Sequence, residues 1–251
     1  PLGLSEHLSM SLEQSQKLIR CSVELAQQAR DTALQEEREK TPSARPRQLL
    51  VAGSVGPYGA FLANGSEYRG DYQLSNEEFK DFHRPRIEAL IAANVDILAY
   101  ETIPSLPEIK ALIELLETDF TNSTAWLGVT LRESDASLLS DGSPMSEVIR
   151  LVNACDQIVS VGVNCIPEQN VSAALDYLKP LTDKPLIVYP NSGETWNAEA
   201  RQWNGQRAEG KEHAEVVQEW FGKGAKLIGG CCRTGPKDIQ NIRDTLASCR
   251  P

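Results

Sequence analysis

Short apolar runs alternate with amphipathic segments along most of the chain, and this alternation limits the folds that it can adopt. Near-continuous apolar strands separated by helices predict a parallel sheet that those helices cover. The predicted strands are residues 49–54, 95–101, 125–131, 158–165, 185–190 and 225–230. The predicted helices are residues 12–38, 76–92, 106–116, 144–153, 167–178, 209–221 and 236–246, and we expect Pro85 to kink or interrupt the second of them.

Two α/β architectures fit this pattern, an open doubly wound sheet and a (β/α)₈ barrel of the TIM type. The barrel is favoured because residues with useful chemistry stand at or just after most strand ends, where barrel enzymes place their active sites. No GxGxxG sequence follows the first predicted strand, which disfavours a dinucleotide-binding fold. The residues at strand ends are Ser54, Glu101, Cys165, Asn191, Cys231 and Cys232.

The strand count differs from that of a closed barrel, which has eight strands. Six are predicted here, although the 251 residues would suffice for a whole barrel by length. We therefore expect one barrel domain over residues 1–251 in which the leading helix is the second helix of the barrel. In this interpretation the first strand, the first helix and the second strand are absent from the sequence.

Composition excludes several classes of partner. The formal net charge is −10 with a pI near 4.9, and no run of Lys or Arg could follow a phosphate backbone, so we expect no nucleic-acid partner. No apolar stretch approaches the ~18 residues of a membrane span, and no signal-peptide pattern opens the chain. We expect a cytoplasmic protein whose partners are small molecules and whose thiols stay reduced.

Three cysteines carry the strongest chemical signal. Cys165 closes one apolar run, and Cys231 and Cys232 follow Gly229 and Gly230 after another. Three thiolates from two strand ends can hold one zinc ion and leave its fourth position open, as in a catalytic site. Burial as small apolar residues and a disulfide are the alternatives, and we favour the metal. Ordinary packing is expected instead for Cys21, Cys155 and Cys249.

A zinc ion held by three thiolates accepts another soft sulfur, so a thiol substrate is the expected fourth ligand. Coordination would deprotonate that thiol, and the predicted reaction class is alkyl transfer to sulfur. Glu101 could bind a substrate ammonium group, or it could simply be an acid near the start of the next helix. Asn191 could form a hydrogen bond with the substrate, or it could belong to an ordinary Asn-Ser-Gly turn.

Two loops, residues 55–72 and 195–203, are rich in aromatic and polar residues. Such a loop could enclose a sulfonium ion by cation–π contact, and an ordinary solvent-facing loop is the alternative. The candidate aromatic residues are Tyr58, Tyr68, Tyr72 and Trp196. His83 lies within a helical pattern, and we expect it to be structural rather than catalytic.

Several segments resemble the homocysteine S-methyltransferases, within them the branch that uses S-methylmethionine or S-adenosylmethionine. These segments are VAGSVGPYGAFLANGSEYRGDY, ETIPSLPEIKAL, GVNC, VYPNSGE and GGCCRTGP. The resemblance implies a (β/α)₈ barrel, zinc on Cys165, Cys231 and Cys232, and homocysteine sulfur as the fourth ligand. It also implies that Glu101 helps to bind the homocysteine amino group.

The expected function is zinc-dependent methyl transfer from a sulfonium donor to L-homocysteine, giving methionine. We place S-methylmethionine ahead of S-adenosylmethionine because no recognisable adenosine pocket is present. The family's N-terminal part, with its Asp-Gly strand end, has no counterpart in this sequence. The alternative is therefore a truncated, non-catalytic zinc-binding relative that acts by binding or oligomerisation.

Overall fold

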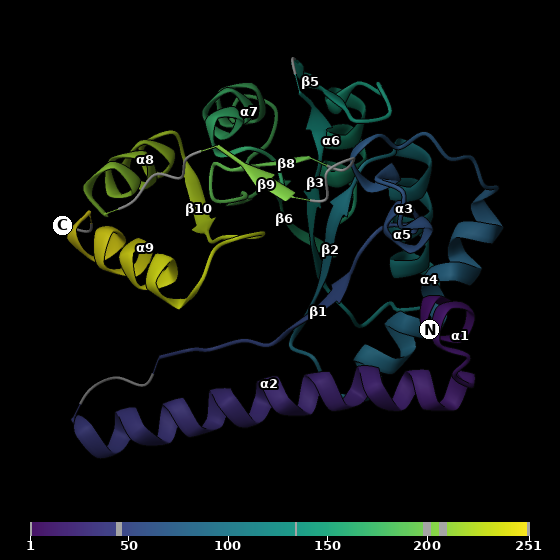
Figure 1. The fold of residues 1–251 in the computed structure, drawn as a ribbon, viewed down its shortest axis with the longest axis horizontal. Coiled ribbons are helices and arrows are strands. Elements are labelled where there is room, and N and C mark those ends of the chain that lie inside the picture. The colour runs from purple at the N-terminus through teal and green to yellow at the C-terminus, as the bar shows by residue number, and fades with distance from the viewer. Residues whose placement is uncertain (1, 44–46, 134, 198–201, 206–209, 250–251) are drawn as a thin grey trace.

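The computed structural model describes residues 2–43, 47–133, 135–197, 202–205 and 210–249. Its centre is a six-stranded sheet in which every neighbouring pair is parallel (Figure 1). The strands are β1 (Ala52–Val55), β2 (Ile97–Ile103), β3 (Ala125–Val129), β6 (Ile158–Asn164), β7 (Leu186–Tyr189) and β10 (Ala225–Ile228). All six strands predicted from the sequence are therefore confirmed.

The order of the strands decides between the two predicted architectures. Neighbours in the sheet follow chain order from β1 to β10, with no point at which the order reverses. A doubly wound sheet requires such a reversal, whereas a barrel winds in one direction. The winding is that of a barrel, and among the described residues the outer strands β1 and β10 do not pair with each other.

Seven helices match the predicted ones to within a few residues at each end. They are α2 (Leu12–Lys40), α4 (Asn76–Ala92), α5 (Leu106–Thr118), α6 (Met145–Ala154), α7 (Val171–Leu178), α8 (Gly210–Gly222) and α9 (Pro236–Ser248). Local chemistry explains the start of α4, where Ser75 and Glu78 form a reciprocal capping box. In the described part of the chain, no helix combines the length and apolar character needed to cross a membrane.

Helix α4 continues through Pro85, so the predicted interruption is wrong. A proline removes one backbone N–H and one helical hydrogen bond. Tertiary packing offsets that loss, because Phe79 and Ile87 on either side of Pro85 are buried in the core.

The structure contains several short elements that the sequence did not predict, and all of them except helix α1 come after a strand of the sheet. Before α4, these are helix α1 (Leu2–Leu8), helix α3 (Tyr58–Leu62) and the short helix η1 (Ser66–Tyr68). After β3, strands β4 (Leu131–Arg132) and β5 (Asp135–Leu139) form an antiparallel hairpin. The remaining ones are the short helix η2 (Glu168–Asn170) and the hairpin of β8 (Thr195–Asn197) with β9 (Gln202–Asn204).

A buried polar network fastens the loop of residues 56–72 to helices α4 and α5. Glu108 and His83 are fully buried, and His83 Nε2 lies 2.8 Å from Glu108 Oε1. Arg86 donates to His83 Nδ1 and to the Gly56 carbonyl, so His83 is neutral and donates through Nε2 to Glu108. Glu108 also accepts the Tyr58 backbone N–H and the Tyr72 hydroxyl. His83 therefore has the structural role that the sequence predicted.

This network should make stability depend on pH. Burial lowers the pKa of His83 below 6.5, and the neighbouring Glu108 offsets only part of that effect. As pH falls below 6.5 the unfolded chain takes up a proton that folded His83 does not, so the free energy of unfolding should fall by at most ~1.4 kcal/mol per pH unit. Between pH 7 and 5, the free energy of unfolding measured with urea should change less steeply with pH in His83→Gln than in wild type. His7 is exposed, so His7→Gln should keep the wild-type dependence of the free energy of unfolding on pH. The same pH dependence in wild type and His83→Gln would contradict the prediction.

Candidate metal centre

Three cysteine side chains meet at the carboxyl end of the sheet. Cys165 directly follows β6, and Cys231 and Cys232 lie in the loop after β10. Their sulfur atoms all lie within 4.8 Å of one another, and Cys165 Sγ is 3.5 Å from Cys232 Sγ. Tetrahedral zinc with bonds of about 2.3 Å would place its thiolate sulfurs about 3.8 Å apart. The cluster could therefore hold a metal ion, and its spacing fits zinc.

The loop after β7 holds the cysteine loops in place through the backbone. Cys231 N–H donates to the Pro190 carbonyl at 2.8 Å, and Cys165 N–H donates to the Tyr189 carbonyl at 3.1 Å. Asn191 Oδ1 accepts the Cys232 N–H at 3.3 Å. Asn191 thus lies beside the cluster, where its amide oxygen supports the backbone of Cys232.

Close packing within the loop that carries Cys231 and Cys232 explains why position 230 is a glycine. A Cβ atom at this position would lie 2.4 Å from Thr234 Oγ1. That hydroxyl donates to the Cys231 carbonyl at 2.7 Å and closes the turn. The glycine before the cysteine pair therefore permits the irregular backbone that brings both sulfurs to one side.

The three thiols differ in how readily they ionise. Hydrogen bonds from Cys165 and Cys231 lower the pKa of Cys232 to about 3. Hydrogen bonding with Cys231 and Cys232, together with burial, raises the pKa of Cys165 well above its ordinary value. One thiolate is thus favoured at the expense of another, and a divalent cation would allow all three to ionise together.

Glu101 lies at the same end of the sheet, on β2. It is half-buried and accepts a hydrogen bond from the Ser54 hydroxyl on β1. The Tyr189 hydroxyl accepts a hydrogen bond from Trp126 Nε1 at 2.9 Å. Burial raises the pKa of Tyr189, and the charges of Glu101 and Cys231 raise it further. Glu101 and Cys231 thus act on the same hydroxyl, which places the carboxylate near the cysteine cluster.

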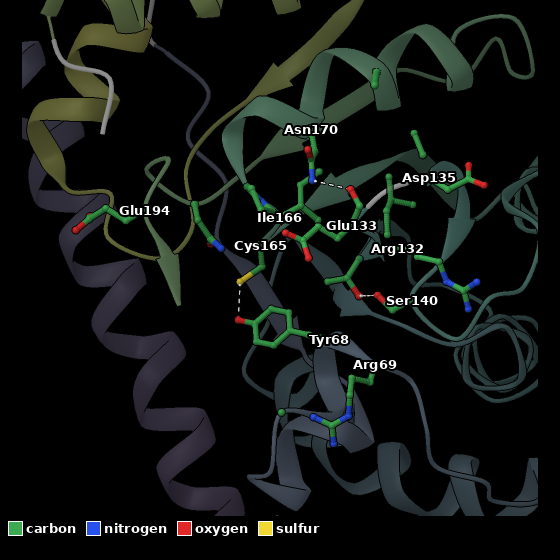
Figure 2. Close-up of a pocket in the computed structure, with 17 residues that line it drawn as sticks. Tyr68, Arg69, Arg132, Glu133, Asp135, Ser140, Cys165, Ile166, Asn170 and Glu194 are labelled. Carbon is green, nitrogen blue, oxygen red and sulfur yellow. Dashed lines mark hydrogen bonds between the residues drawn. The ribbon is translucent and has the colours of Figure 1, made fainter. Parts of the chain in front are cut away.

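A cavity of about 480 Å³ opens beside Cys165 (Figure 2). The β4–β5 hairpin contributes Arg132, Glu133 and Asp135 to its wall, and the start of α7 contributes Ala173. Further lining residues include Tyr68, Arg69, Asn170, Asn191 and Glu194. Among the described residues that line the cavity, Cys165 represents the cysteine cluster, and Glu101 is not one of them.

The aromatic candidates that the structure describes lie in two different environments. The Tyr68 ring lines the cavity, and its hydroxyl lies 3.3 Å from Cys165 Sγ (Figure 2). Tyr58 and Tyr72 instead pack together with Phe79 and Phe82 between the loop and α4, so these two candidates do not line the cavity. The hydrophobic cluster and the Glu108 bond hold them there. The Trp196 side chain lies outside the part that the structure describes.

Sequence reasoning missed three residues at the site, namely Asn164, Tyr189 and Arg233. Asn164 stands beside Cys165 in GVNC, and Tyr189 precedes Pro190 in VYPNSGE, so both lay within segments already singled out. Arg233 pairs with Glu194 at 3.1 Å and ties the loop after β10 to the loop after β7. The contacts made by these three residues have no local sequence signal, because each contact joins different strands or the loops that follow them.

The fold and the site together define a class, a barrel-type α/β enzyme with a three-cysteine cluster at the carboxyl ends of its strands. The family model for homocysteine S-methyltransferase matches residues 4–246. The chain therefore belongs to the homocysteine S-methyltransferase family, whose activity is methyl transfer to homocysteine.

Named relatives cover most of the chain. The homocysteine S-methyltransferase of Escherichia coli K12 is 50% identical over 230 residues, which are 92% of this chain and 71% of that protein. A selenocysteine methyltransferase of Astragalus bisulcatus is 38% identical over 94% of this chain and 72% of its own length. The metallated crystal form of the homocysteine methyltransferase MmuM from Escherichia coli has a TM-score of 0.83 at 46% identity, over 97% of this chain and 75% of that one.

Proposed function

We propose that this protein is a zinc-dependent methyltransferase that moves a methyl group from a sulfonium donor to L-homocysteine and yields methionine. The observation that carries the proposal is the cluster of three cysteine sulfurs within 4.8 Å of one another, beside a cavity of about 480 Å³. Cys165, Cys231 and Cys232 would hold the zinc ion. Bound there, zinc would supply an open position that keeps a substrate thiol ionised at neutral pH.

Glu101 would bind the ammonium group of homocysteine. The Ser54 hydroxyl donates to one of its carboxylate oxygens, and an ionised carboxylate has further lone pairs that can accept a substrate N–H. Asn191 already uses its amide oxygen for the Cys232 backbone. Its amide nitrogen, at the wall of the cavity, would donate a hydrogen bond to a substrate oxygen.

The cavity would take the methyl donor. The face of the Tyr68 ring would stabilise a sulfonium cation, and the acidic and basic residues of the wall suit a ligand with both an ammonium and a carboxylate group. In the transfer, an electron pair of the homocysteine sulfur forms the new bond to the methyl carbon. The bond between that carbon and the donor sulfur breaks, and its electron pair stays on the donor sulfur. The donor becomes a neutral thioether, so the transfer neutralises the opposite charges of the sulfonium and the thiolate.

Competition kinetics test the donor. We expect the purified protein to contain about one zinc ion per chain and to show a larger kcat/KM with S-methylmethionine than with S-adenosylmethionine. Betaine as the best donor would overturn the sulfonium assignment, and full activity of metal-free protein would overturn the zinc assignment. Zinc and homocysteine binding without turnover of any donor would favour the non-catalytic alternative.

Tyr68 supplies the matched control for this experiment. Tyr68→Phe keeps the aromatic ring and removes the hydroxyl, whereas Tyr68→Leu removes the ring. Since a desolvated cation–π contact contributes up to ~2 kcal/mol, Tyr68→Leu should lower kcat/KM for the sulfonium donor by up to ~30-fold relative to Tyr68→Phe. Equal values in the two variants would argue against the ring as the sulfonium contact.

A further inference from the structure

Asn164 connects the strand that ends in Cys165 to the strand that carries Glu101. Its side chain is 1% exposed and lies at the end of β6. Its Oδ1 accepts the Thr102 backbone N–H at 2.7 Å, and its Nδ2 donates to Thr102 Oγ1 at 2.8 Å. Both halves of one amide therefore hold a single residue of β2, the residue directly after Glu101.

The strand between β2 and β6 is β3, and the amide reaches across it at a glycine. A Cβ atom on Gly128 would lie 2.6 Å from Asn164 Oδ1 and 2.7 Å from the Tyr189 hydroxyl. The missing side chain thus provides the space through which Asn164 contacts Thr102.

The residues that Asn164 joins have unusual backbone conformations. Thr102 has φ +62° and Cys165 has φ +52°, both in the left-handed region. A β-branched residue with positive φ is a genuine outlier and persists only where its surroundings hold it. For Thr102, the surroundings include the two Asn164 hydrogen bonds. Loss of these bonds would let Thr102 relax to negative φ and would turn the adjacent Glu101 away.

We propose that Asn164 is a positioning residue for homocysteine: by holding Thr102 in its left-handed conformation, it fixes the Glu101 carboxylate at a set place relative to the Cys165 sulfur. This inference rests on the proposed function, in which Glu101 binds the substrate ammonium and the cysteines hold the metal. A thiol ligand without an amino group would not depend on this arrangement.

Calorimetry on zinc-loaded protein tests the inference without turnover. The two ligands are L-homocysteine and 4-mercaptobutanoate, which is homocysteine without its amino group. Asn164→Ala should bind homocysteine about 10-fold to 100-fold more weakly than wild type, by analogy with the loss seen when a residue that orients a metal ligand is changed. Its zinc content and its affinity for 4-mercaptobutanoate should match those of wild type.

A double-mutant cycle with Glu101→Gln shows whether Asn164 acts through Glu101. The double variant should bind homocysteine no more weakly than whichever single variant has the lower affinity for it. Thr102→Val, which removes only the hydroxyl, should show a smaller loss in the same direction and serves if Asn164→Ala does not fold. Additive losses, or equal losses for both ligands, would overturn the inference. Wild-type protein that binds neither thiol would overturn the proposed function instead.

Discussion

Cys232→Ala is expected to lose bound zinc and homocysteine turnover together. Cys232 is the thiol of the cluster whose pKa is lowered, to about 3, by hydrogen bonds from Cys165 and Cys231, so it is a ready thiolate ligand. Without it two sulfurs remain, and a catalytic zinc site normally has three protein ligands. We expect zinc affinity and kcat/KM to fall by on the order of 100-fold or more, beyond the 10-fold to 100-fold cost of changing an outer residue.

Elemental analysis and methyl-transfer assays on the same sample would measure both losses. Cys21→Ala is the matched control, because Cys21 is exposed and stands outside the cluster. It should keep about one zinc ion per chain and wild-type turnover. Unchanged zinc in Cys232→Ala would contradict the ligand assignment, and a zinc-depleted variant with full activity would contradict the role of the metal.

Gly162→Ala should cause the largest loss of stability. Gly162 lies on β6 opposite Ile187 of β7, and a Cβ atom there would lie 1.8 Å from the Ile187 carbonyl oxygen. The three nearest atoms all belong to the Ile187 backbone, so the clash can be relieved only by moving β7 away from β6. We expect a loss of at least ~4 kcal/mol, a large part of the 5–15 kcal/mol that stabilises a typical protein.

Urea unfolding would measure this loss where the variant can be purified. Gly222→Ala is the control, because Gly222 is exposed at the end of α8 and a Cβ atom there would have nothing within 4 Å. It should unfold at the wild-type urea concentration or slightly above it. A free energy of unfolding for Gly162→Ala within ~1 kcal/mol of wild type would show that the two strands accommodate the added methyl group.

The centre is assembled from strands that lie side by side in space but far apart in the sequence. The cysteine cluster joins the ends of β6 and β10, and the end of β7 with the residue after it supports both through its backbone. The predicted ammonium site on β2 is linked to the cluster by Asn164 and by Tyr189. A substitution in one of these strand ends should therefore affect the others.

Elements with local signals could be predicted from the amino-acid sequence without coordinates. Apolar periodicity predicted six strands and seven helices, and the Ser75–Glu78 pair fixed the start of α4, because a capping box needs only residues three apart. Cys165, Cys231 and Cys232 stood at strand ends, and parallel strands bring their carboxyl ends to one edge. Their convergence could therefore be predicted without coordinates.

Features that depend on contacts between distant segments could not be predicted in this way and became visible in the folded chain. Four aromatic residues looked equivalent in the sequence, and packing against α4 turned Tyr58 and Tyr72 away while Tyr68 reached Cys165. Asn164 gave no signal of its own, because its partner Thr102 lies 62 positions away on a strand that is not its neighbour. Helix α4 likewise passes through Pro85 because the core on both sides of the proline holds it. Periodicity specifies which face of an element is buried, but the residues that this face contacts depend on how the strands come together.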